Sequence, residues 1–209
     1  AHTQVAMPAL PGRTNHLLSP IILPLFRHNG RLCVWATRRS RALRDHAGEI
    51  CFPGGRPEAN DDDLAATARR ELREELGLEV GPILGALSRV PVYTSDYRLV
   101  PFVAEVTDSA APQGQASEVA EILRLDVAAE LSRPSIEAIP FAVEDHRSLV
   151  PVFAPLDQGG QPQGALMYGA TAITFFEFLT VLAPLYGLPS PPKLVAGSHD
   201  WQSITKTLY

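Results

Sequence analysis

The chain has 209 residues and a formal net charge of −5 at neutral pH, with 45% apolar and 20% charged residues. This composition is typical of a globular protein with its own core and excludes a disordered chain. The acidic balance predicts no nucleic-acid partner, because such a partner requires a basic face. The 19 prolines are roughly twice the usual share, which excludes one long helical bundle and favours strands and turns.

Neither Cys33 nor Cys51 lies in a metal-binding spacing, and we expect both to be small buried side chains. The first residues carry no basic segment followed by an apolar one, so no signal peptide is predicted. The sequence also predicts no membrane span, because it contains no unbroken run of 18 apolar residues. We therefore expect a cytoplasmic protein without a membrane partner.

Residues 1–19 place prolines among small polar residues and predict an irregular arm. Two apolar runs flank Asn29-Gly30, a pair typical of tight hairpin turns, and predict strands over 20–26 and 32–37. An arginine-rich loop over 38–48 and a short extended segment over 49–52 follow.

From Leu64 to Leu78 apolar residues recur at four-residue spacing, which predicts an amphipathic helix. Asn60 or an aspartate after it can cap the first turn, and Gly77 marks the end. The later elements predicted in chain order are strands over 81–93, 98–106 and 119–125, a short helix over 127–132, a hairpin of 147–153 with 165–168 around Asp157, and a long apolar helix over 170–186. The chain shows no clear linker, so one domain is expected.

The predicted helix over 64–78 carries clustered glutamates, Glu71, Glu74 and Glu75, which share a face because they are spaced by three and four residues. Like charges at these spacings destabilise a helix by a few tenths of a kcal/mol per pair, and a divalent cation would reverse that sign. Mg²⁺ or Mn²⁺ prefers carboxylate oxygens and bridges to phosphates. The turn at Gly54-Gly55 lets backbone carbonyls approach the same ion. The alternative is a solvated face on which the neighbouring arginines Arg69, Arg70 and Arg73 pair with the glutamates.

Residues 70–78, Arg-Glu-Leu-Arg-Glu-Glu-Leu-Gly-Leu, resemble the second half of the Nudix box. The pattern of that box is G, five residues, E, seven residues, REUxEExGU, where U is aliphatic. The first half departs from it: counted back from Arg70, the early acidic position falls on Asp62 and the glycine position on Arg56. The loop before the helix therefore carries one added residue.

The segment 37–55 closely resembles the signature of the coenzyme A diphosphatase branch of the Nudix family, TxRS followed by LRxHxGExxFPGG. Later segments also resemble this branch: Val100-Pro101-Phe102-Val103, Glu118-Val119 and Tyr168-Gly169-Ala170-Thr171-Ala172. Two positions depart, since Tyr168 stands where the branch has tryptophan and Ile173 where it often has arginine. The resemblance runs in patches from about residue 21 to 186.

The resemblance implies an α/β fold, an α/β/α sandwich with a mixed β-sheet in which the box forms a loop–helix–loop. The implied Nudix hydrolase domain spans 20–188, between an irregular arm over 1–19 and an irregular tail over 189–209. The implied activity is Mg²⁺- or Mn²⁺-dependent hydrolysis of the diphosphate of coenzyme A, or of a derivative, to 3′,5′-ADP and 4′-phosphopantetheine. Two alternatives stay open: a Nudix hydrolase of ADP-ribose, a dinucleotide or a similar compound, and a non-catalytic Nudix-fold binding module.

The roles expected from the resemblance begin with the metal ligands Glu71, Glu74, Glu75 and the carbonyl of Gly55. These ligands would neutralise the diphosphate and lower the pKa of a bound water. Glu71 is the first candidate for the general base, and Glu118, from a later loop, is its rival. Arg70 is expected to orient a glutamate through a bidentate pair.

The substrate is expected to be a small nucleotide, and Arg39 and Arg44 are candidates for its 3′-phosphate because guanidinium groups match phosphate geometry. Their alternative is a surface loop with local ion pairs. Gly54 and Gly55 are expected to border the substrate, and Tyr168 either stacks on adenine or packs in the core. The turn at Ser95-Asp96-Tyr97 either borders the pocket or is plain surface. The apolar helix over 170–186 also offers a surface for a homodimer.

Overall fold

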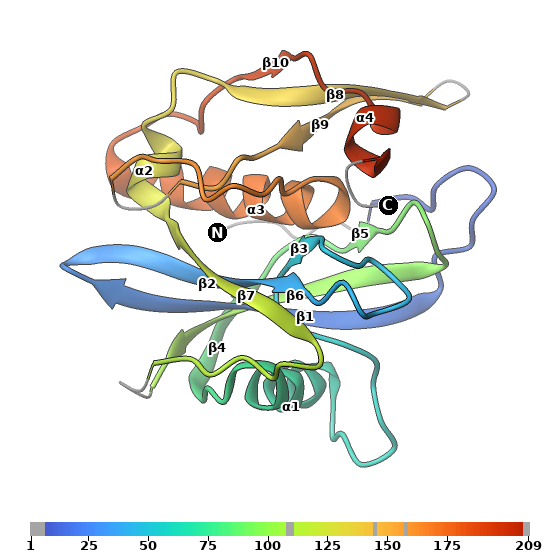
Figure 1. Cartoon of the computed structure of the whole chain (residues 1–209), viewed down its shortest axis with the longest axis vertical. Helices are drawn as coiled ribbons and strands as arrows, with labels where there is room; N and C mark the ends of the chain where they lie inside the picture. Colours follow the sequence, from blue (N-terminus) through green and yellow to red (C-terminus); the bar gives the residue numbers. More distant parts are fainter. Residues whose placement is uncertain (1–6, 108–110, 144–145, 157–158, 207–209) are drawn as a thin grey trace.

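The computed structural model describes residues 7–107, 111–143, 146–156 and 159–206. Its elements form four layers: helix α1, a seven-stranded sheet, helix α3 and a three-stranded sheet (Figure 1). Helix α1 covers one face of the large sheet, and α3 lies between the other face and the small sheet. The predicted α/β sandwich with a mixed sheet is confirmed, and the three-stranded sheet is an addition that the sequence did not predict.

The large sheet is built around β1, which pairs antiparallel with β2 and parallel with β6. Its strands are β1 Leu17–His28, β2 Arg31–Arg39, β3 Ile50–Cys51, β4 Val80–Ala86, β5 Val90–Pro91, β6 Tyr97–Val106 and β7 Val119–Asp126. Asn29 and Gly30 both have positive φ, 49° and 76°, so the predicted hairpin turn between β1 and β2 is confirmed. The predicted strand over 81–93 is divided into β4 and β5, which both pair with β6.

Helix α1, Leu64–Leu76, forms where the four-residue apolar spacing predicts it. Its apolar side, which includes Ala68 and Leu72, packs against Ile22 and Ala104 of the sheet. The Asp63 carboxylate accepts a hydrogen bond from the Ala66 N–H at 2.7 Å and caps the first turn. The helix ends at Gly77, which adopts the left-handed conformation with φ 66°. The packing leaves the glutamates on the flank of the helix.

The second core surrounds helix α3, Gly169–Leu182, which a 3₁₀ turn extends to Tyr186. Phe175 and Phe178 are buried there against both sheets. The other elements of this half are α2 Val127–Leu131, β8 Ile136–Val143, β9 His146–Val152, β10 Leu194–Ala196 and α4 Trp201–Lys206. By length and composition alone, the segment Gly169–Tyr186 could cross a membrane, with mean hydropathy 1.4. Its position between two sheets is that of a core helix.

Three sequence predictions about the chain ends and the second half are wrong. Strand β1 begins at Leu17, inside the predicted arm, because 17–19 pair with the start of β6. The predicted hairpin of 147–153 with 165–168 is a single bridge, Phe153 to Met167, because β9 pairs with β8 instead. Its tip at Asp157 lies outside the described residues.

The tail from 189 to 206 is ordered into a strand and a helix, not irregular. Strand β10 lies parallel to β8. The Glu137 carboxylate accepts hydrogen bonds from the backbone N–H of His199 at 2.9 Å and pairs with its ring Nδ1 at 2.7 Å. Ile204 of α4 is 2% exposed and packs on Ile139 and Val152. The tail is therefore part of the second core.

Candidate active site

The turn at Gly54-Gly55 brings backbone against the glutamates of α1. Gly54 forms a bridge with Ile21 of β1, and the Gly55 N–H donates to the Pro20 carbonyl at 3.2 Å. A Cβ on Gly55 would lie 2.2 Å from Oε1 of Glu71, and a Cβ on Gly54 would lie 2.4 Å from the Pro20 carbonyl oxygen. Only glycine permits this approach at either position.

Three carboxylates from two elements lie near this turn. Glu75 is 4% exposed, and burial raises its pKa to about 8. The positive charge of Arg39 and the donating N–H of Gly54 oppose that rise, while Glu71 and Glu118 add to it. Burial also raises the pKa of Glu71 above its usual range, with Arg70 opposing. Deprotonating this cluster is therefore costly in the absence of a cation.

The Glu118 loop is fixed to the end of α1 by main-chain hydrogen bonds. The N–H groups of Gln113 and Gln115 donate to the carbonyls of Leu76 and Glu75 at 2.9 and 3.0 Å. The Gln115 carbonyl in turn accepts from the N–H groups of Glu118 and the next residue, where β7 begins. These bonds satisfy helix carbonyls that otherwise have no partner and set Glu118 near Glu75.

Arg39 lies at the end of β2, beside Val119 of β7, and the neighbouring Ser40 N–H donates to the Glu118 carbonyl at 2.7 Å. Its guanidinium acts on the Glu75 carboxylate and hydrogen-bonds the buried thiol of Cys51. Burial raises the pKa of Cys51 to about 11, which keeps the thiol protonated. The Nε of Arg39 is buried and has no hydrogen-bond partner among the described residues. The structure thus brings Arg39 to the carboxylates.

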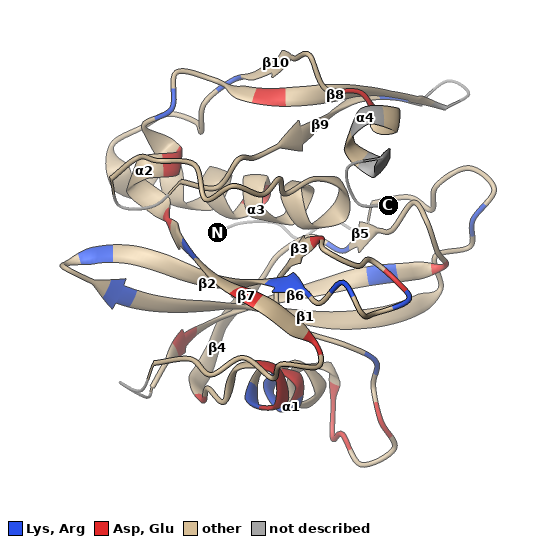
Figure 2. Cartoon of the chain, viewed as in Figure 1, with Lys and Arg blue, Asp and Glu red and all other residues tan. Residues whose placement is uncertain are grey.

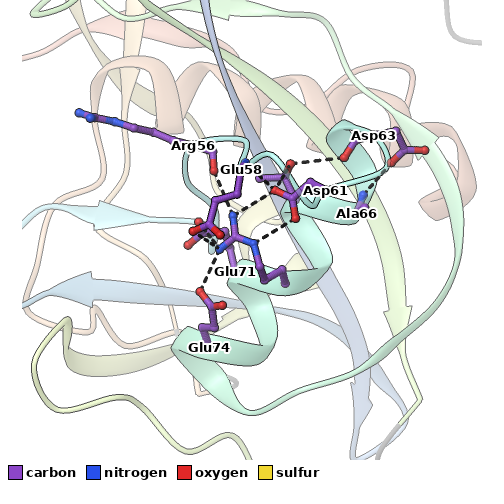
Figure 3. Close-up of polar contacts among 9 residues, drawn as sticks. Arg56, Glu58, Asp61, Asp63, Ala66, Glu71 and Glu74 are labelled. Atoms are coloured by element: carbon purple, nitrogen blue, oxygen red, sulfur yellow. Dashed lines mark hydrogen bonds and ion pairs between the residues drawn. The ribbon is translucent and has the colours of Figure 1, made fainter.

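Arg70 is the centre of a polar cluster at the start of α1. Figure 3 labels its partners Arg56, Asp61, Glu71 and Glu74. Its Nη1 donates to Glu71 and to Glu74, each at 3.0 Å, and its Nη2 donates to the carbonyl of Arg56 at 3.0 Å. Its Nε and Nη2 donate to the two oxygens of Asp61 at 3.1 and 3.2 Å. Arg70 therefore contacts Glu71 and Glu74 through single hydrogen bonds, and its bidentate partner is Asp61, not a glutamate as expected.

Asp61 occupies the early acidic position of the pattern. Counting back from Arg70 assigns that position to Asp62, one residue later. Its carboxylate also accepts from the Glu58 N–H and the Thr67 hydroxyl, both at 2.9 Å. The Arg70 guanidinium lowers the pKa of Asp61 to about 2. The added loop residue lies between Asp61 and the helix, a place that counting alone does not reveal.

The alternative prediction is a solvated helix face whose glutamates pair with neighbouring arginines. It describes only the edge of the glutamate cluster. Glu74 has a side chain 52% exposed and pairs with Arg70. Arg73 instead pairs with Glu79, and Arg69 donates to the Val80 carbonyl at 2.8 Å. Of the three arginines, Arg70 is thus the one in ion-pair contact with the glutamates.

Two predicted substrate-binding residues lie outside the carboxylate cluster. Arg44 is exposed on the loop that follows β2. Tyr168 precedes α3, on the opposite face of the large sheet from α1, and packs against the core of Ile139, Val152 and Ile204. This position fits the core role that the sequence offered as the alternative to stacking on adenine.

Among the residues that the structure describes, no three acidic, histidine or cysteine side chains are gathered in a ready-made metal site. The chemistry of the cluster nevertheless fits a hard divalent cation. Glu71 lies against Gly55, in space that a Cβ would fill. Glu75 and Glu71 are partly or wholly desolvated carboxylates with raised pKa values, and carboxylate and carbonyl oxygens are the ligands such ions prefer.

Fold and site define an α/β protein with carboxylates on a helix facing a glycine turn, as in hydrolases of phosphate compounds. The NUDIX domain model matches residues 16–150, and the chain belongs to the Nudix family. Nudix hydrolases generally require a divalent metal ion.

Two curated mouse (Mus musculus) relatives carry the name coenzyme A diphosphatase. The peroxisomal enzyme NUDT7 is 36% identical over 114 residues, which cover 53% of this chain and 48% of the relative. The mitochondrial enzyme NUDT8 is 31% identical over 194 residues, which cover 88% of each chain. A solved structure, a MutT/nudix family protein from Enterococcus faecalis, matches with TM-score 0.49 and 13% identity, over 81% of this chain and 61% of that chain.

The chain spans about half the length of the first of these relatives. The matches confirm the expected membership of the Nudix family and the expected resemblance to the coenzyme A diphosphatase branch.

Proposed function

We propose that the protein hydrolyses the diphosphate of coenzyme A or of a coenzyme A derivative, giving 3′,5′-ADP and 4′-phosphopantetheine. The observation that carries the proposal is the contact of the Gly54-Gly55 turn with Glu71 and Glu75, with Arg39 and Glu118 beside them. Both the turn and Arg39 belong to the segment 37–55, which resembles the coenzyme A signature. The relatives named coenzyme A diphosphatase support the same substrate.

The metal would be held by Glu71, Glu74, Glu75 and the carbonyl of Gly55. A bound Mg²⁺ or Mn²⁺ supplies charge neutralisation of the diphosphate and a more acidic water. Arg70 holds Glu71 and Glu74 in place. The Arg39 guanidinium, whose positive charge acts on Glu75, would add positive charge beside the diphosphate at the reacting end of the substrate.

Glu118 is our choice for the general base. One oxygen of Glu71 is engaged by Arg70 at 3.0 Å and lies against Gly55, which reduces its capacity to take a proton. Glu118 forms no ion pair among the described residues and reaches the cluster from a separate loop. A base outside the ligand set can accept a proton without disturbing the ligands.

The test is a turnover assay with coenzyme A, ADP-ribose and a nucleoside triphosphate, each with Mg²⁺, Mn²⁺ or EDTA, with products identified by mass. We expect 3′,5′-ADP from coenzyme A and none with EDTA. Glu71→Gln and Glu118→Gln should each lower kcat by about 10²-fold or more, while Glu121→Gln, outside the cluster, serves as control. Hydrolysis of ADP-ribose but not coenzyme A would overturn the substrate, and binding without turnover would favour the non-catalytic alternative.

A cytoplasmic location and a homodimer remain predictions. The two named relatives are peroxisomal and mitochondrial. The segment over 170–186, which the sequence offers as a dimer surface, lies between the sheets and exposes Leu185 and Tyr186 at its end. Size-exclusion chromatography with light scattering tests the dimer, and microscopy of the tagged protein in its own cells tests the location.

A further inference from the structure

An open cavity of about 350 Å³ lies beside Arg56 and Pro57 of the loop before α1, at the start of β1 and β6. Leu18 and Leu64 contribute apolar walls, and His16, Arg56 and Tyr97 contribute polar or aromatic ones. The Arg56 guanidinium carbon lies over the Tyr97 ring, 5.1 Å from its centroid. The cavity therefore combines a flat stacked cation with apolar walls.

Arg56 connects this cavity to the reaction centre. Its carbonyl accepts from Arg70, while its side chain points away from the Arg70 cluster (Figure 3). Gly55, the preceding residue, lies against Glu71, and its carbonyl accepts from the Ser19 hydroxyl at 3.3 Å. Hydrogen bonds from Arg70 and from Ser19 hold this loop on both sides. The cavity therefore keeps a constant position relative to the carboxylates.

The cavity is at the small end of the range for ligand sites, about 300–1,000 Å³, so it suits one ring system and not a whole dinucleotide. Tyrosine rings and arginine guanidinium planes are the groups on which nucleobases stack. Leucine side chains can pack along the edge of such a ring. A nucleobase can stack on the guanidinium and pack against the leucine side chains. A flexible acyl chain cannot stack on a cation.

We propose that this cavity binds the purine ring of the nucleotide substrate, stacked on the Arg56 guanidinium that Tyr97 supports from behind, and so sets the preference for an adenine nucleotide. The proposal rests on the proposed function for the nature of the substrate. It goes further by placing the base at the cavity of His16, Arg56 and Tyr97, and not at Tyr168. The predicted turn at Ser95-Asp96-Tyr97 then borders the substrate.

The test uses equilibrium binding, so that it does not depend on turnover. Calorimetric titration of the full chain with adenosine 3′,5′-bisphosphate, uridine 3′,5′-bisphosphate and 4′-phosphopantetheine compares the two ends of coenzyme A. Arg56→Ala and Tyr97→Leu should weaken adenosine bisphosphate binding about tenfold or more and change phosphopantetheine binding little. Tyr97→Phe should retain the affinity, because it retains the ring. Arg147→Ala, an exposed arginine on β9, is the matched control.

Steady-state kinetics add a second readout: both disruptive variants should raise the KM for coenzyme A more than they change kcat. Unaltered adenosine bisphosphate binding in Arg56→Ala and Tyr97→Leu would overturn the proposal. So would a larger loss with phosphopantetheine, which would assign the cavity to the other end of the substrate. Arg56 is exposed, so Arg56→Ala should fold and test the proposal even if Tyr97→Leu does not fold. Purine binding that depends on the cavity, without coenzyme A hydrolysis by the wild type, would refute the proposed function alone.

Discussion

Glu75→Gln should make the metal-free protein more stable and less active. The Glu75 side chain is 4% exposed, and burial, reinforced by Glu71 and Glu118, raises its pKa to about 8. In the unfolded chain the pKa of a glutamate is about 4.3. The folded state therefore binds this proton more tightly, and the stability of the protein falls as the pH rises from about 4.5 to 8.

The size of the effect follows from the shift in pKa. Each pKa unit corresponds to about 1.4 kcal/mol, so the shift of Glu75 corresponds to roughly 3–5 kcal/mol above pH 8. Glutamine has nearly the same volume, keeps an acceptor for the Gly54 N–H and carries no charge. We expect Glu75→Gln to exceed the wild type by at least about 2 kcal/mol near pH 9 in EDTA, and the difference to vanish near pH 4.5.

Urea unfolding in EDTA and in excess Mg²⁺, at several pH values between about 4 and 9, measures this difference. Mg²⁺ should stabilise the wild type and leave the variant nearly unchanged, because only the folded wild type has the full ligand set. Glu74→Gln, at an exposed carboxylate of the same helix, should change stability by less than about 1 kcal/mol. If Glu75→Gln were no more stable than the wild type near pH 9 in EDTA, the argument from burial would be refuted.

Three further outcomes are expected. Asp61→Asn should lower kcat/KM about 10–100-fold, because it loosens Arg70 and with it Glu71 and Glu74, whereas Asp62→Asn should not. Equal losses in the two variants would contradict the assignment of Asp61. Gly55→Ala should abolish most activity with little loss of Tm, because its Cβ displaces a catalytic carboxylate, while Gly85→Ala, where a Cβ meets nothing, should retain activity. Ile204→Ala should cost about 2–4 kcal/mol in urea unfolding, and a negligible cost would show that the tail does not belong to the core.

The features that sequence predicted well depend on short spacings. Helix α1 follows from apolar residues four apart, and the approach of Glu71 and Glu75 to one site follows from the same helix period. The mixed sheet and the glycine turn follow from the resemblance of 37–78 to a known signature. The residues that form these patterns lie close together in the sequence. The patterns therefore do not depend on how distant parts of the chain pair.

The features that sequence missed depend on long-range partners. Strand β10 has three residues and finds its partner β8 about sixty positions earlier, so no local pattern reports it. The pairing of β9 with β8 is an exception, because the two strands follow each other in the chain; it was missed because no strand is predicted over 136–143. The change from Asp62 to Asp61 depends on where a loop absorbs one extra residue, and the cavity of His16, Arg56 and Tyr97 assembles from three separate segments.

The loop that ends at Glu118 has a consequence for how the site tolerates change. Its main-chain bonds to Leu76 and Glu75 need an N–H at positions 113 and 115, which every residue except proline supplies. Side chains at Gln113 and Gln115 are therefore free to vary without moving Glu118. A single inserted residue between 115 and 118 would instead break the bonds that tie Glu118 to the turn. Length, and not composition, is what this part of the enzyme has to keep.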